Sequence, residues 1–194
     1  MLKRVAAVAT GLALVAGTAG AAEWEIDKAH SSVQFKVSHM VITKVTGRFG
    51  DVSGKLTFDG KDLAGGTVEM QVAVGSINTD NENRDNHLKS DDFFNAETYP
   101  YITFKSKKVI PGDGNKFKLV GDLTIRDVTR EVTFDCEFYG LAETGQGTKS
   151  GFEATTRINR QDFGVKWSKT LDNGGLVAGN DVDIVVELEF NKVS

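Results

Sequence analysis

The sequence is poor in cysteine and proline: among its 194 residues there are two prolines and one cysteine, Cys136. A single thiol cannot form a disulfide within the chain, so the fold must be held together by its core. Cys136 shares its alternating register with Val132, Phe134 and Phe138. This pattern predicts a buried, unreactive thiol, because a reactive one needs exposure and a nearby cation.

Positive charge is also scarce. The formal net charge is −4, and it becomes −6 when Lys3 and Arg4 are left out. Nucleic-acid binding requires a basic face, and electrostatic docking to anionic lipid requires a polybasic cluster. The sequence has neither, so we expect no nucleic-acid partner.

Long hydrophobic runs are missing as well. The apolar stretch at residues 5–16 is too short to cross a bilayer, which needs roughly 20 residues. It follows Lys3 and Arg4 and precedes Ala19-Gly20-Ala21, a small-residue cleavage signature. We therefore expect residues 1–21 to be a cleaved signal peptide and residues 22–194 to form the exported protein.

Motifs for catalysis or metal binding are absent. There is no G-x-S-x-G elbow, no phosphate-binding P-loop and no G-x-G-x-x-G. His30, His39 and His87 lack the close spacing of a typical zinc site, and a calcium loop would need glycine where Asp85 stands. We expect a protein that is not an enzyme and has no metal or cofactor, with a histidine-dependent metal enzyme as a lesser alternative.

What the sequence does contain is period-two alternation of apolar and polar residues, the pattern of antiparallel strands with one buried face. The alternating segments are residues 31–38, 68–74, 117–125, 132–138, 152–158 and 182–190. Short turn signals separate them, which predicts a meander of about eight strands. The pattern alone leaves a sandwich and a closed barrel open. We expect the strand glycines Gly47, Gly50, Gly54 and Gly121 to mark bulges or bends.

Two insertions interrupt the strand rhythm. In residues 78–95, Thr79 and Glu82 have capping-box spacing, which predicts a short helix from Asp80 to about Lys89. In residues 159–179 we expect a helical turn followed by a loop. Insertions of this kind belong at the rim of a barrel, where they can shape an entrance.

Three segments together resemble the YceI-like family: residues 26–39 (IDKAHSSVQFKVSH), 84–106 (RDNHLKSDDFFNAETYPYITFKS) and 158–167 (INRQDFGVKW). The resemblance covers nearly all of residues 22–194. It implies an all-β fold, an antiparallel eight-stranded lipocalin-like barrel with a short helix and rim loops. It also implies a periplasmic protein that holds a polyisoprenoid, an isoprenoid quinone or a related amphiphile. A membrane-embedded b-type cytochrome as partner and self-association as a homodimer are implied in the same way.

The interior of such a barrel is either filled by side chains or able to hold one small ligand. Uncharged, aromatic inward positions favour an apolar ligand, since a polar one would lose hydration without replacement. A stress-related interaction module with a filled core and no ligand is the alternative. The residues that we expect to contact a ligand are Phe35, Val37, His39, Phe58, Val72, Arg84, His87, Phe94, Phe104, Phe134, Phe138, Phe152, Phe163 and Trp167.

The residues of the first insertion allow two interpretations. In the first, the segment is a structural lid: Leu88, Phe93 and Phe94 plug the barrel while Arg84 and Asp85 brace neighbouring strands. In the second, Arg84, His87 or Lys89 contacts a polar head group such as a phosphate or a quinone oxygen. Trp167 is suited to the barrel mouth because its ring is amphipathic. Arg160, Asp162 and Phe163 could clamp the second loop.

Overall fold

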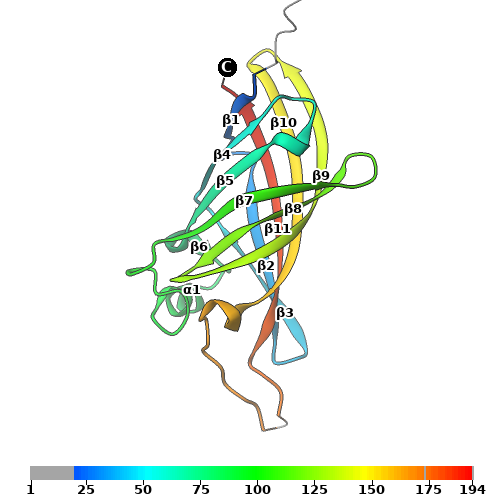
Figure 1. Ribbon diagram of the computed structural model, residues 1–194. Coiled ribbons are helices and arrows are strands. Elements are labelled where there is room, and N and C mark those ends of the chain that lie inside the picture. Colours follow the sequence, from blue (N-terminus) through cyan, green and yellow to red (C-terminus); the bar gives the residue numbers. More distant parts are fainter. Residues whose placement is uncertain (1–19, 173, 194) are drawn as a thin grey trace, which may run out of the picture.

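The computed structural model describes residues 20–172 and 174–193, so most of the expected signal peptide lies outside the described residues. One antiparallel sheet dominates the structure (Figure 1). Its strands are β1 Ala22–Ile26, β2 Ser32–His39, β3 Thr43–Phe49, β4 Val52–Phe58, β5 Thr67–Ala73, β6 Ile77–Asn78, β7 Tyr101–Pro111, β8 Lys116–Ile125, β9 Val128–Thr144, β10 Gly147–Asn159 and β11 Ala178–Lys192. The helices are α1 Glu82–Lys89 and the short 3-10 segments η1 Leu63–Gly65, η2 Val74–Ser76 and η3 Arg160–Phe163. In the part of the chain just described, no helix is long and apolar enough to cross a membrane.

These strands form a closed eight-stranded barrel because three pairs of consecutive strands each act as one interrupted long strand. β11 pairs with β1 near Phe190 and with β2 farther along, at Ala178 to Glu187. In the same way β1 pairs with β4 while β2 pairs with β3, and β4 pairs with β5 while β3 pairs with β6. The break between β3 and β4 includes Gly50, at an expected bend. The expected barrel is confirmed, because β1 pairs with both β4 and β11 and so closes the sheet on itself.

One end of the barrel is filled by a group of aromatic side chains, here called the aromatic plug. Its members are Trp24, Phe58, Phe117, Phe138, Phe152 and Phe190. Phe138 and Phe152 stack with ring centroids 4.9 Å apart, and the Trp24 indole donates a hydrogen bond to the Phe58 carbonyl at 3.1 Å. Fully burying one such side chain contributes about 1.5–3 kcal/mol. The plug therefore closes and stabilises this end.

Two strand glycines make room for large neighbours and do not form bulges. A Cβ atom at Gly47 would lie 2.3 Å from the Phe35 ring, and one at Gly54 would lie 2.3 Å from Sδ of Met70. The strand registers are continuous at both positions, so the prediction of bulges there was wrong. Gly121 does lie opposite a register shift in β7.

Both insertions lie where the strand rhythm breaks, and the first holds helix α1. The side chain of Asn81 caps this helix by accepting a hydrogen bond from the Arg84 amide at 2.9 Å. The prediction that Thr79 provides the cap was wrong, because the Thr79 hydroxyl instead donates to Asp85 at 2.5 Å.

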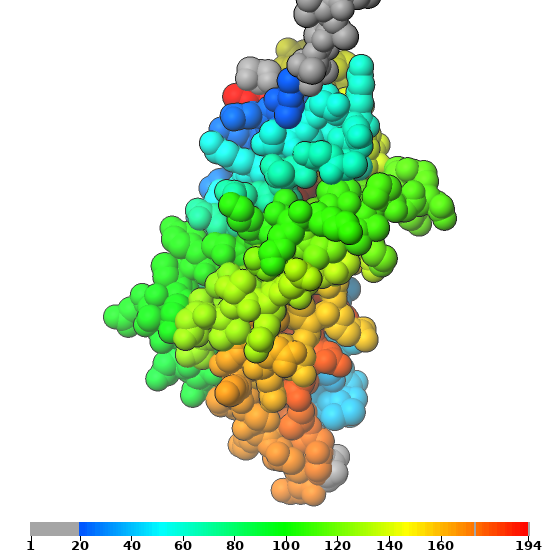
Figure 2. Space-filling view, in the orientation of Figure 1, coloured from blue at the N-terminus to red at the C-terminus, as the bar shows by residue number. Residues whose placement is uncertain are grey.

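The first insertion projects from one side of the barrel and the β7–β8 hairpin from the other (Figure 2).

In the second insertion the expected helical turn is η3. The Asn159 side chain caps it by accepting a hydrogen bond from the Gln161 amide at 3.0 Å. The loop that follows η3 runs back to β11 at the end of the barrel opposite the aromatic plug (Figure 1). Both insertions therefore lie in the half of the barrel that the plug does not fill.

The side chain of the cysteine is buried, as its alternating register predicted. Cys136 is 7% exposed, and burial raises the pKa of its thiol to about 12. A thiol that stays protonated is a weak nucleophile. The prediction of a buried thiol is confirmed.

Candidate ligand-binding cavity

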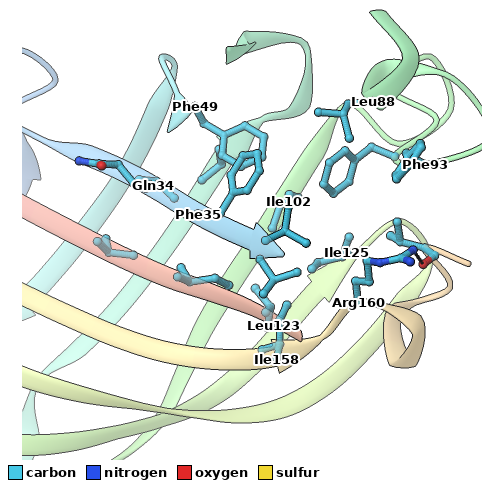
Figure 3. Close-up of a pocket in the computed structure, with 18 of the residues that line it drawn as sticks. Gln34, Phe35, Phe49, Leu88, Phe93, Ile102, Leu123, Ile125, Ile158 and Arg160 are labelled. Carbon is cyan, nitrogen blue, oxygen red and sulfur yellow. Dashed lines mark hydrogen bonds between the residues drawn. The ribbon is translucent and has the colours of Figure 1, made fainter. Parts of the chain in front are cut away.

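Beyond the aromatic plug, the barrel encloses a cavity of about 360 Å³ (Figure 3). This volume lies within the usual range of small-molecule sites. Its wall is almost entirely apolar and includes Val33, Phe35, Val37, Phe49, Val72, Ile102, Phe104, Leu119, Leu123, Ile125, Phe134, Ile158, Val182, Ile184, Val186 and Leu188. Leu88 and Phe93 lie on one side of the space, across from Leu123 and Ile158 (Figure 3).

Most of the residues expected to contact a ligand line this cavity. They are Phe35, Val37, His39, Val72, Arg84, His87, Phe94, Phe104, Phe134 and Trp167. Phe58, Phe138 and Phe152 do not line it, because they belong to the aromatic plug. Phe163 does not line it either: this last residue of η3 is 2% exposed and packs in the core. Alternation shows which side chains point inward, but it cannot show which end of the barrel is filled.

Aromatic pairs stiffen the cavity wall. Phe104 and Phe134 meet edge to face with centroids 5.3 Å apart. Phe49 contacts both Phe35, at 5.7 Å, and Phe94, at 6.2 Å. Sequence reasoning missed Phe49, although its place in an alternating strand gave the necessary signal. Such a wall offers dispersion contacts without hydrogen-bonding groups, which suits a hydrocarbon chain.

Four side chains from the two insertions meet at the rim. His87 Nε2 lies 2.9 Å from Asp92 Oδ2, and the His87 ring packs against Phe93 at 5.0 Å and Trp167 at 5.4 Å. Phe93 and Trp167 are themselves 5.2 Å apart. The side chain of His87 is 43% exposed while also lining the cavity, so the cavity reaches solvent here. This end is therefore the mouth of the barrel.

A second cluster ties helix α1 to Thr79, the residue that follows β6. Arg84 donates from Nε to Thr79 Oγ1 and from a terminal nitrogen to the Thr79 carbonyl, both at 2.7 Å. Asp85 accepts from the amide and the hydroxyl of the same threonine, which is 4% exposed. These bonds support the interpretation of Arg84 and Asp85 as braces.

The most unusual charge at the cavity is Arg160, which is 6% exposed. Its guanidinium donates to the carbonyls of Gly179 at 2.8 Å and Val165 at 2.7 Å, with longer bonds to Ala178 and Asn180. Burial lowers the pKa of this arginine, and among the described residues no carboxylate forms an ion pair with it. A buried cation beside an apolar cavity favours an electron-rich group on whatever enters.

A cluster of ligand-type residues lies outside the cavity, where Asp27, His30 and Glu189 offer atoms within 4.8 Å of one another. The Lys149 ammonium lies 3.0 Å from Asp27 and 2.6 Å from Glu189. Its hydrogen bond is the main reason that the pKa of the Asp27 carboxyl lies well below its usual range. An ion-pair network therefore accounts for this arrangement without a metal.

Taken together, the geometry defines a class of protein: a closed lipocalin-like barrel with a plugged end, an apolar cavity and a mouth built from two insertions. Residues 24–190 match the YceI-like domain, and the chain belongs to this family. Family membership and fold thus agree with the expectation drawn from the sequence motifs.

Relatives and solved structures support the same assignment. UPF0312 protein SA2479 of Staphylococcus aureus is 38% identical over 167 residues, covering 85% of this chain and 95% of that protein. The Campylobacter jejuni YCEI protein is 36% identical with a TM-score of 0.70, covering 87% of this chain and 96% of that one. Burkholderia cenocepacia BcnA is 27% identical with a TM-score of 0.71, covering 84% and 98%. A polyisoprenoid binding domain from Saccharophagus degradans shares the fold at 16% identity and a TM-score of 0.66, covering 87% and 98%.

Proposed function

We propose that this protein binds one long-chain amphiphile, of the polyisoprenoid or isoprenoid quinone type, in its barrel. The observation that carries the proposal is the apolar cavity of about 360 Å³ between the aromatic plug and the mouth. A protein whose barrel served only as a structural core would gain stability by filling this space. The proposed role is stoichiometric binding and not catalysis: storage, sequestration or transfer of the lipid.

Burial of hydrocarbon supplies the affinity in this proposal. Each buried methylene contributes roughly 0.8 kcal/mol, so a dozen carbons contribute about 10 kcal/mol before costs. Association and ordering remove several kcal/mol of that sum. The tail therefore determines how tightly the lipid binds, and the aromatic plug limits how far the tail can extend into the barrel.

A head group would then determine orientation. Arg160 is the buried cation at the cavity, and four of its hydrogen bonds go to neutral oxygens. A phosphate or carboxylate oxygen would be a stronger partner for it than those neutral oxygens, because it carries negative charge. We propose Arg160 as the residue that faces the head group, whereas Arg84 and His87 mainly brace the rim.

The relatives are consistent with this role. A barrel of the same fold from Saccharophagus degradans is described as a polyisoprenoid binding domain, although at 16% identity the likeness concerns the fold alone. We propose that the protein acts in the periplasm, with support from the charged, apolar and small-residue order of residues 1–21. The b-type cytochrome partner and the homodimer stay predictions.

The test is native mass spectrometry of the gently purified mature protein, followed by organic extraction of bound material. A discrete adduct that extracts as an isoprenoid or quinone is the expected result. A bare mass for the folded protein, together with no uptake of added geranylgeraniol, would contradict the proposal.

A matched pair of substitutions on one strand then locates the binding site. Phe104 faces the cavity, whereas Tyr101, also on β7, is 48% exposed. Phe104→Asp should abolish occupancy, because a buried carboxylate would lack a partner, and Tyr101→Asp should leave occupancy unchanged. If Phe104→Asp does not fold, Phe104→Trp tests the same point by filling part of the cavity. Equal occupancy in all variants would place the lipid elsewhere.

A further inference from the structure

The tip of the β2–β3 hairpin carries three consecutive exposed hydrophobic residues, here called the apolar finger: Met40, Val41 and Ile42. Their exposed fractions are 38%, 69% and 84%. The other large hydrophobic residues that are exposed in the described part of the chain are not consecutive. Such a run in contact with water is unfavourable unless something covers it.

The backbone of the finger makes its composition more unusual. Met40 and Val41 have φ angles of 51° and 67°, and the Ile42 amide donates to the His39 carbonyl at 3.2 Å. A tight hairpin turn with two positive φ angles favours Asn and Gly, and a β-branched residue there is strained. The residues at this tip are therefore unfavourable for the backbone conformation of the turn. Where residues conflict with local structure in this way, a functional reason is expected.

The finger stands beside the mouth of the cavity. His39, which precedes it, lines the cavity, and so does Val177 in the loop opposite. The Met40 amide donates to the Val177 carbonyl at 3.0 Å and so joins the finger to that loop. Figure 1 shows the hairpin and the loop projecting from the same end of the barrel, away from the C-terminus.

We propose that the apolar finger inserts into the surface of a lipid bilayer and so places the mouth of the barrel against the membrane. This inference rests on the proposed function in one respect: a lipid ligand must be taken up from a membrane or returned to one. Apolar side chains on a projecting tip are suited to the boundary between head groups and acyl chains. The finger would thus give the lipid a path that avoids water.

A bilayer fits this surface better than a second copy of the chain does. Stable protein interfaces bury about 800 Å² on each partner and are flat or complementary in shape. Three residues on a convex tip provide too little area, whereas a fluid bilayer can close around them. Charge is not the main attraction, because the chain is acidic and Lys44 beside the finger is paired with Asp183 at 3.0 Å.

The experiment is flotation of the mature protein with phosphatidylcholine vesicles. We expect Val41→Gly/Ile42→Ser to weaken partitioning by about tenfold or more, since two apolar side chains no longer leave water. Glycine suits the positive φ at position 41, so the variant should fold at least as well as the wild type. The control is Leu141→Ser, which removes a 44% exposed leucine whose strand position pairs with Ser150 beside the plug. It should partition like the wild type.

Ile42→Trp provides an independent measure of depth. Trp24 is buried in the plug and Trp167 lies at the mouth, so the wild-type protein gives the quenching by brominated acyl chains that these two residues contribute, and quenching above that level comes from the tip. We expect this quenching with the Ile42→Trp protein above the wild-type level. Its absence, or wild-type flotation by Val41→Gly/Ile42→Ser, would overturn the inference.

The outcomes separate this inference from the proposed function. Protein that carries extractable lipid but does not float with vesicles would leave the function standing and refute the finger. Protein that floats with vesicles through the finger but never takes up lipid would leave the finger standing and refute the proposed function. A concentration-dependent dimer that Val41→Gly/Ile42→Ser abolishes would identify a second copy as the occupant and would also refute the bilayer.

Discussion

His87 and Trp167, from the two separate insertions, meet edge to face at the barrel mouth with ring centroids 5.4 Å apart. They are 80 residues apart in the sequence, and each insertion is held by hydrogen bonds of its own, from Arg84 to the Thr79 carbonyl and from Arg160 to the Val165 carbonyl. The contact therefore links two independently supported segments across the opening. A ligand that enters or leaves through this opening passes beside the pair.

The first prediction concerns that contact. Trp167→Ala should speed ligand release by about three- to tenfold, because aromatic pairs of this kind contribute about 0.5–1.5 kcal/mol. Stopped-flow release of a fluorescent isoprenoid analogue measures the rate. Tyr139→Ala is the control, since Tyr139 is 60% exposed and does not line the cavity. An unchanged rate in Trp167→Ala would show that release follows another path.

The second prediction concerns the aromatic plug. Phe152→Ala should lower the free energy of unfolding by about 3–5 kcal/mol, the usual cost of such a buried truncation. It should also extend the cavity toward the closed end and shift bound lipids toward longer tails. Chemical denaturation and mass spectrometry of extracted lipid measure the two effects. Phe152→Leu, which keeps most of the volume, should show much less of both.

The third prediction concerns the ion pairs of Lys149 with Asp27 and Glu189. Since the pKa of Asp27 is depressed in the folded protein, its stabilisation is present above pH 3.8 and is lost as the pH falls below that value. Lys149→Met should therefore destabilise the protein at pH 7, where two carboxylates would remain side by side. Denaturation across pH 2–7 should show the difference from wild type shrinking toward low pH. A difference that does not depend on pH would attribute the loss to packing.

The fourth prediction concerns Cys136. Burial raises the pKa of its thiol from 9.0 to about 12, so the protonated form is favoured by folding. The stabilisation is complete below pH 9 and is lost as the pH rises from 9 to 12. At pH 8 the thiol should resist Ellman's reagent in the folded protein and react promptly in denaturant. Prompt reaction without denaturant would mean that β9 opens locally.

Several features of the site could be predicted from the sequence because they depend on local pattern. Alternation assigned Phe35, Phe104 and Phe134 to the interior, since side chains on a strand point to opposite faces in turn. Spacing placed a helix in residues 80–89, and the structure has α1 at Glu82–Lys89. The family motifs located the rim residues Arg84, His87 and Trp167.

Other features depend on where segments meet in space. Alternation predicts that Phe134 and Phe152 both point inward. Only their positions along the barrel axis show that Phe134 lines the cavity and that Phe152 belongs to the plug. The cap of α1 shows the same limit. Thr79 had suitable spacing, but Asp85 and Arg84 both bond to it, and Asn81 takes the capping position.

The sequence by itself determined the family, the strand composition, the polarity of the interior and the two insertions, because each depends on residues close together in the chain. Tertiary structure alone decided which end of the barrel is filled, how large the cavity is and that His87 meets Trp167. It also placed the apolar finger beside the mouth. These features depend on barrel closure, which brings β11 against β1 and β2 and sets the height of every inward side chain.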